Sequence, residues 1–208
     1  MAQMKTPGVY IIEKNAFPNS VVEVATAIPA FIGHTQFARD GNKDLTGIPF
    51  RISSMAEFHS FFGFAPTLRF GIRPEDSESE DTTNDINVLF PDGSCQLTLP
   101  KTFYALYYNM LLFYANGGGP CYIVSVGDYE HDFKSIDFTN ALLALKKEQE
   151  PTLVVVPEAV YMEEGDCYKV QTAALMHCGN DMKNRFAILD VFNGYKDENG
   201  AVIKSFRE

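Results

Sequence analysis

The chain has 208 residues, of which 46% are hydrophobic and 21% are charged, which is enough to bury a core of ordinary size in a globular protein. A formal net charge of −10 disfavours nucleic-acid binding, because phosphate recognition needs clustered Lys and Arg. We find no stretch near the ~20 apolar residues of a membrane helix and no basic-then-apolar leader, so we expect cytoplasmic synthesis without membrane insertion.

The first 20 residues predict an extended N-terminal arm. A turn-forming triplet precedes four residues of high β propensity, and the candidate arm residues are Thr6, Pro7, Gly8, Val9, Tyr10, Ile11, Ile12 and Glu13. An exposed strand of this kind can pair with the sheet edge of a neighbouring subunit. The alternative is an edge strand that folds onto its own domain.

An apolar strand at 28–33 is expected to begin the core, and residues 36–100 are expected to form a loop-rich insertion. Within it, Ser54 and Glu57 have the spacing of a capping box, which predicts a short helix ended by Gly63. Residues 71–85 hold six acids and one base, which favours a solvated, mobile loop.

The remaining chain alternates helical and strand patterns. Helices are predicted at 103–114, at 138–147 with Asp137 as cap, and at 166–178 with Gly179 at the end; strands are predicted at 122–126, 152–156 and 185–191. Uniformly apolar strands that alternate with helices indicate an α/β fold with a mostly parallel sheet covered by helices on both faces. The core would comprise residues 21–35 and 101–192.

Three glycines, Gly117–Gly119, follow the first long helix and precede a strand. A phosphate-binding loop has the opposite order, in which the glycines open the helix and a Lys-Ser/Thr pair follows. Because that order is absent, the glycines favour a helix C-cap turn over a phosphate site.

Three carboxylates, Asp128, Glu158 and Asp190, lie at or just after the ends of predicted strands. In a parallel sheet these ends share one edge, so the three side chains could hold Mg²⁺. The alternative is that they are solvated or cap the following helices. The four cysteines have no ligand spacing and the four histidines are scattered, so we expect free, mostly buried thiols and no other metal site.

Several words of the sequence resemble those of contractile tail sheath proteins, the subunits of phage tails and related injection particles. They are TPGVYI at 6–11, IPAFIGHT at 28–35, the SSMAEF…FFG helix at 53–63, NGGGPCY at 116–122, and the strands at 151–160 and 185–191. Their order spans nearly 190 residues, and NGGGPCY is the most specific of them.

The resemblance implies a structural subunit with no catalytic site, cofactor or metal. Such subunits pack as helical rings around an inner tube, and contraction drives the tube through a target envelope. The implied partners are other copies of the chain, the tube protein, and baseplate and terminator proteins. Residues 193–208 would begin a C-terminal continuation that contacts the tube. The particle would assemble in the bacterial cytoplasm and become part of a virion or an injection particle.

Two other classes of function remain open from the residues alone. One is a Mg²⁺-dependent α/β hydrolase or phosphotransferase that uses Asp128, Glu158 and Asp190. The other is a generic oligomeric binding module. The sequence does not separate a phage tail from a bacterial injection system.

Overall fold

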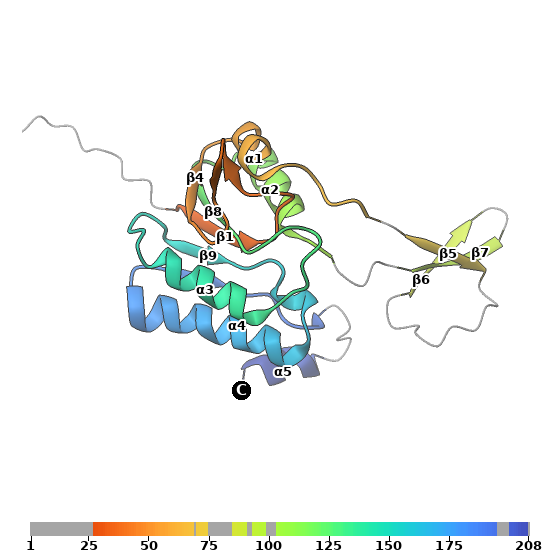
Figure 1. Ribbon diagram of the computed structural model, residues 1–208. Coiled ribbons are helices and arrows are strands. Elements are labelled where there is room, and N and C mark those ends of the chain that lie inside the picture. The colour runs from red at the N-terminus through yellow and green to blue at the C-terminus, as the bar shows by residue number, and fades with distance from the viewer. Residues whose placement is uncertain are drawn as a thin grey trace, which may run out of the picture.

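The structure is a computed structural model that describes residues 27–68, 70–74, 85–90, 93–98, 103–194 and 200–207. Its centre is a five-stranded sheet in the order β10-β9-β1-β8-β4, shown in Figure 1. The strands are β1 (Pro29–Gly33), β4 (Phe50–Ile52), β8 (Cys121–Ser125), β9 (Leu153–Val155) and β10 (Phe186–Ile188). All neighbouring pairs are parallel except β4 with β8, so the predicted α/β class with a mostly parallel sheet is confirmed.

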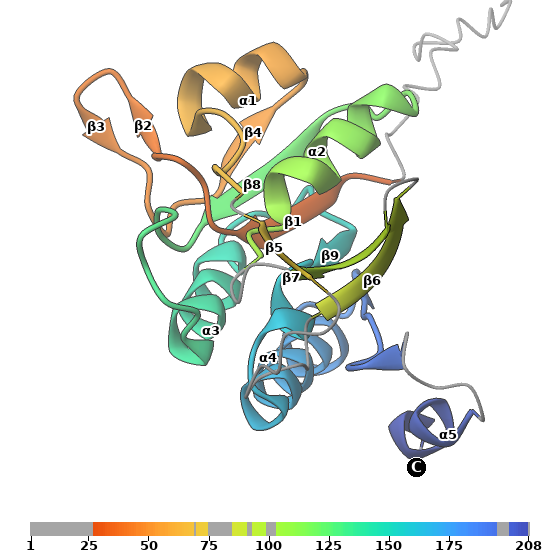
Figure 2. The same cartoon turned by 90° about the vertical axis from the view of Figure 1, so that its right-hand side faces the viewer.

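Helices cover both faces of this sheet, as Figure 2 shows. The helices are α1 (Met55–Phe62) and α2 (Leu106–Ala115) on one face, and α3 (Ser135–Leu145) and α4 (Glu164–Met176) on the other. Side chains along β1 alternate between the two cores: Phe31 packs with α1 and α2, whereas Ala30 and Ile32 pack with α3 and α4. A strand buried on both faces must be apolar throughout, which explains the IPAFIG run.

The cap of α1 is largely as the sequence predicts. Ser54 Oγ accepts a hydrogen bond from the Glu57 amide at 3.2 Å, and Gly63 ends the helix with a φ of 86°. The Glu57 carboxylate reaches one residue further back than a capping box requires and accepts from the amide of Ser53 at 2.6 Å. Two side-chain hydrogen bonds, one accepted by Ser54 and one by Glu57, therefore stabilise the first turn of α1.

Three predicted helix boundaries are wrong. Helix α2 begins at Leu106; Phe103 precedes it, and its ring stacks on Tyr108 and lies tilted against Tyr161. Helix α3 begins at Ser135, which places Asp137 in the first turn, where an acid also favours a helix, instead of at the cap. After α4 the chain continues through a π-helical turn, His177–Met182, so Gly179 does not end it.

The predicted insertion divides into two parts. Residues 50–62 belong to the core, because β4 joins the main sheet and α1 packs on it. A second, three-stranded sheet in the order β5-β7-β6 lies to one side in Figure 1 and comprises β5 (Gly71–Pro74), β6 (Asp85–Phe90) and β7 (Gly93–Thr98). Both ends of the predicted acidic loop 71–85 are thus strands; its acids at 75–81 lie outside the described residues.

Three smaller elements complete the described chain. A short hairpin, β2 (Arg39–Asp40) and β3 (Lys43–Asp44), precedes β4, and a single 3₁₀ turn, Ala159–Tyr161, follows β9. Helix α5 (Ala201–Arg207) follows the main domain. The predicted arm, residues 1–20, lies outside the described residues.

Candidate functional site

At the carboxyl edge of the sheet, the ends of β1 and β9 lie side by side. The chain that leaves β1 continues to β4 and β8 on one side, and the chain that leaves β9 continues to β10 on the other. Open α/β sheets bind their ligands at such a point. Here the position holds the carboxylate of Glu158, which is fully buried. Its Oε2 accepts a hydrogen bond from the His34 amide at 2.9 Å and lies 2.8 Å from His34 Nδ1, and its Oε1 accepts from the Leu106 amide at 3.2 Å.

The residues that follow β1 make this close approach possible. A Cβ on Gly33 would lie 2.9 Å from Leu106 Cβ and 3.1 Å from the Glu158 carboxyl, so only glycine fits without a shift of α2. The His34 ring is 1% exposed and lies against Tyr104, Phe133 and Phe138. The IPAFIGHT word therefore ends in residues that join β1, β9 and α2.

Two neighbouring groups extend this buried network. The hydroxyls of Thr35 and Ser125 lie 2.6 Å apart and link the end of β1 to β8. Burial, followed by the nearby Glu158 carboxylate, raises the pKa of Tyr104, whose hydroxyl donates to the His131 carbonyl. The arrangement holds the strand ends rigidly and gives Glu158 the geometry of a structural group.

The other two candidate metal ligands, Asp128 and Asp190, differ from Glu158 in their surroundings. Asp128 is on a loop, where its Oδ1 accepts from the Glu130 amide at 2.9 Å and contacts His131 Nδ1 at 2.6 Å. These bonds, led by the amide, hold the pKa of Asp128 below its usual range. Asp190 is exposed, and its carbonyl accepts from Gln171. Across the described ranges, no three His, Cys, Asp or Glu side chains are grouped to hold a metal ion.

The glycine-rich turn after α2 is a C-cap, as predicted. Gly117 has a φ of 83°, and the amides of Gly117 and Gly118 donate to the carbonyls of Tyr114 and Phe113. A Cβ on Gly118 would overlap the Phe113 ring at 2.5 Å. Because two of the amides a phosphate would need are already bonded to helix carbonyls, the turn ends α2 and starts β8.

Sequence inspection missed a second buried polar cluster, at the C-terminal end of α3. Arg185 is 4% exposed; its Nη1 donates to the Leu145 carbonyl at 3.1 Å and its Nη2 to the Glu148 carbonyl. Nη1 also lies 3.0 Å from His177 Nε2. Since a guanidinium only donates, Nε2 accepts and the imidazole is neutral. The sequence signal that could have indicated this cluster is Arg185, a charged residue at the start of an apolar strand that follows His177.

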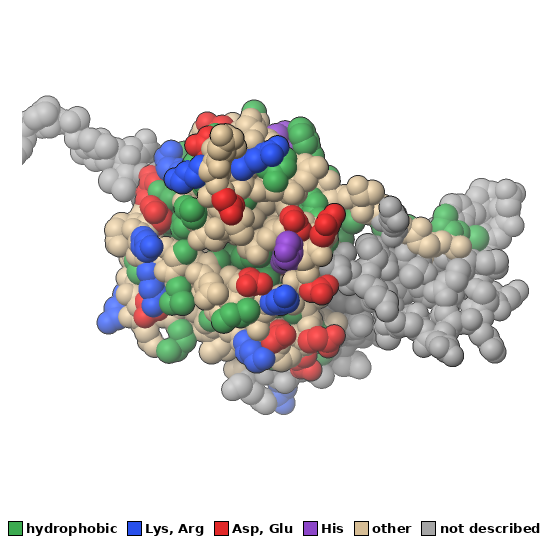
Figure 3. Space-filling view, in the orientation of Figure 1, with side chains coloured by type: hydrophobic (Ala, Val, Ile, Leu, Met, Phe, Trp, Pro, Cys, Tyr) green, Lys and Arg blue, Asp and Glu red, His purple; other side chains and the backbone are tan. Residues whose placement is uncertain are grey.

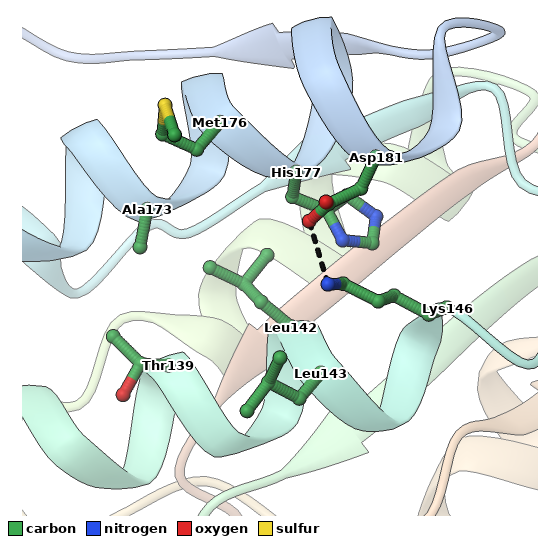
Figure 4. Close-up of a pocket in the computed structure, with 8 residues that line it drawn as sticks. All are labelled: Thr139, Leu142, Leu143, Lys146, Ala173, Met176, His177 and Asp181. Atoms are coloured by element: carbon green, nitrogen blue, oxygen red, sulfur yellow. Dashed lines mark ion pairs between the residues drawn. The ribbon is translucent and has the colours of Figure 1, made fainter.

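A shallow pocket of about 210 Å³ lies beside this cluster, between α3 and α4, and Figure 4 shows its lining. Its walls are mainly apolar, with Leu142 and Leu143 on one side and Ala173 and Met176 on the other. The ion pair between Lys146 Nζ and Asp181 Oδ2, 2.7 Å long, stands at one end. The side chains of α3 and α4 therefore do not fill all the space between the two helices.

We expect His177 to make the fold acid-sensitive. Burial, followed by Arg185, lowers the pKa of His177 from 6.5 to about 4 in the folded chain. The unfolded chain therefore takes up the proton first, so this contribution to stability is complete above pH 6.5 and is lost as the pH falls towards 4. The loss is about 2 kcal/mol by pH 5 and about 3 kcal/mol by pH 4.

Urea unfolding of the wild type and of His177→Gln at pH 7.5, 5 and 4 measures this loss as a difference between the two proteins. The Gln side chain still accepts from Arg185 but does not titrate. His131→Gln, at a histidine whose side chain is 65% exposed, is the matched control and should follow the wild type. Parallel pH curves for wild type and His177→Gln would contradict the assignment.

Among the described residues, one part of the sheet has no helix over it. Helices α1 and α2 cover β4, β8 and β1, but on the same face Phe186 is 76% exposed and Ile188 is 50% exposed. The register places Phe186 beside Leu153 and Ile188 beside Val155, both half-buried. These four residues form an apolar β9–β10 face, a kind of surface that commonly marks a protein interface.

Charges of both signs are interspersed on the molecular face of Figure 3, with acids more frequent towards the side of the three-stranded sheet. Within the described residues, no helix is long and apolar enough to cross a membrane. The four cysteines are free, and Cys121, Cys167 and Cys178 are buried, as predicted. The arm residues 6–13 lie outside the described residues, so their pairing stays a prediction.

Neither the models of known protein families nor the curated proteins contain a match to this chain.

Proposed function

We propose that the chain is a structural subunit of the contractile sheath around the inner tube of a phage tail or a related injection particle. The observation that carries the proposal is the order of the sheath-like words, from TPGVYI at 6–11 to the strand at 185–191. The proposal includes the other assembly partners, namely further copies of the chain and the tube, baseplate and terminator proteins.

The place of these words in the fold supports a framework role. Gly33 and His34 of IPAFIGHT join two strands and a helix, and the glycines of NGGGPCY form the turn from α2 into β8. These two words therefore lie where elements of the main sheet are joined. A sheath subunit needs such joins, since the force of contraction must pass through the sheet without unfolding it.

The uncovered β9–β10 face supports a subunit that is buried in an assembly. Phe186 and Ile188 expose apolar area on β10, the edge strand of the sheet. In a monomer, both an exposed apolar patch and an unpaired strand edge favour aggregation. A neighbouring copy in a helical array would remove this area from water. The predicted arm would supply the link between copies by strand addition.

Electron microscopy of particles from cells that make the protein tests the proposal. An antibody against residues 71–98 should decorate the outer shell along the whole particle, in long narrow and in short wide forms. The chain should also be among the most abundant proteins of the purified particles by mass spectrometry. Recovery of the chain only outside the particles, or label confined to one particle end, would contradict the proposal.

A further inference from the structure

We propose that the donors around Glu158 form a carboxylate-binding site that the protein fills with its own side chain. Three N–H groups converge on one carboxylate: the His34 amide and Nδ1, and the Leu106 amide in the first turn of α2. All three contacts are 2.8–3.2 Å long, and Glu158 is fully buried.

The geometry selects a carboxylate and not merely a polar group. The two backbone amides that contact Glu158 can only donate, and the His34 ring donates to the same carboxylate in the tautomer that carries its proton on Nδ1. The Leu106 amide is one of the unpaired amides of a helix N-terminus, which favours negative charge. The His34 imidazole, 1% exposed, is a second and independent donor aimed at the same oxygen as its own amide.

The space is also shaped for this group. Gly33 lacks the Cβ that would lie 3.1 Å from the carboxyl carbon, so the backbone of β1 forms one wall. The rings of Tyr104, Phe133 and Phe138 enclose His34 on its other sides. If the side chain of Glu158 is shortened, the donors remain fixed by β1 and α2, and a free carboxylate of matching size should take its place.

Size matching gives a sharp test. Glu158→Ala deletes the atoms of one acetate ion, and Glu158→Gly deletes those of one propionate ion. With a Kd of about 10 mM, 0.1 M of the matching ion raises the folding equilibrium constant about elevenfold, which corresponds to a rise in Tm of about 3–6 °C. Thermal melts in each carboxylate salt are compared with melts in the chloride salt at the same pH and ionic strength. Acetate should raise the Tm of Glu158→Ala most, and propionate should raise the Tm of Glu158→Gly most.

Wild type and Glu150→Ala are the controls, because Glu150 is a half-exposed carboxylate that contacts Arg51 and Tyr122. Neither control should distinguish acetate from chloride. Equal melting of Glu158→Ala in the two salts would overturn the proposal. If Glu158→Ala fails to fold in every salt, Glu158→Gln tests the proposal instead. Its side-chain amide places N–H groups against the donors of the site, so this variant should melt far below the wild type. A Glu158→Gln protein as stable as wild type would overturn the proposal.

Discussion

Removing residues 1–13 is expected to leave folded, soluble subunits that no longer form linked sheaths. Among the described residues, the buried apolar core begins at Ile28, so the deletion takes away none of that core. Strand addition contributes several backbone hydrogen bonds at roughly 0.5–1.5 kcal/mol each, and all of them would be lost between copies. Electron microscopy of particles and thermal melts of the purified subunit measure the two effects separately.

A single change gives the matched comparison. Ile11→Pro removes one amide donor and fixes φ, so it should weaken pairing of the arm, whereas Lys14→Ala keeps every backbone donor of residues 6–13. Particles with Lys14→Ala should look like the wild type. If the deletion lowers the Tm of the isolated subunit sharply, the arm is an edge strand of its own domain and the linkage idea is wrong.

Replacing Arg185 by Met is expected to destabilise the fold by about 3–5 kcal/mol. The methionine keeps most of the buried volume but leaves the carbonyls of Leu145 and Glu148 and Nε2 of His177 without their donor. Each buried acceptor left without a partner costs about 1–3 kcal/mol. The C-terminal end of α3 also loses the positive charge that favours it. Urea unfolding at pH 7.5 measures the change.

Arg51→Met is the matched control. Arg51 is 46% exposed and pairs with Glu150 at 3.0 Å, an ion pair in contact with water that is worth at most about 1 kcal/mol. The same substitution should therefore have a small effect there. Equal losses at the two positions would mean that the hydrogen bonds of Arg185 add nothing beyond those of a surface arginine.

Local features of the fold could be predicted because short stretches of chain determine them. The apolar run of β1, the Ser54 cap with Gly63, and the turn at Gly117 depend on neighbours a few residues away. The same local signals were wrong at Gly179, where the chain continues as a π-helical turn until Lys183 reverses it with a φ of 59°. His177, the first residue of this turn, contacts Arg185 at 3.0 Å, a tertiary contact that lies outside the reach of a local signal.

The candidate site was predicted only in part. Glu158 was singled out for its place after an apolar strand, and the parallel sheet does bring this edge together. The metal interpretation treated Asp128, Glu158 and Asp190 alike, but burial distinguishes them: Glu158 is fully buried, and Asp190 is exposed. No local pattern shows which acid a neighbouring element will cover.

Periodicity and backbone preference act within one element, and for this reason the alternation of strands and helices, the α/β class and the turns between elements could be inferred from the sequence. Long-range packing brings His34 to Glu158, 124 positions away, and Arg185 to Leu145, 40 positions away. It also decided that α1 and α2 leave the β9–β10 face open. These features follow from strand order and from which surfaces lie against each other, and both are set by packing of the whole chain.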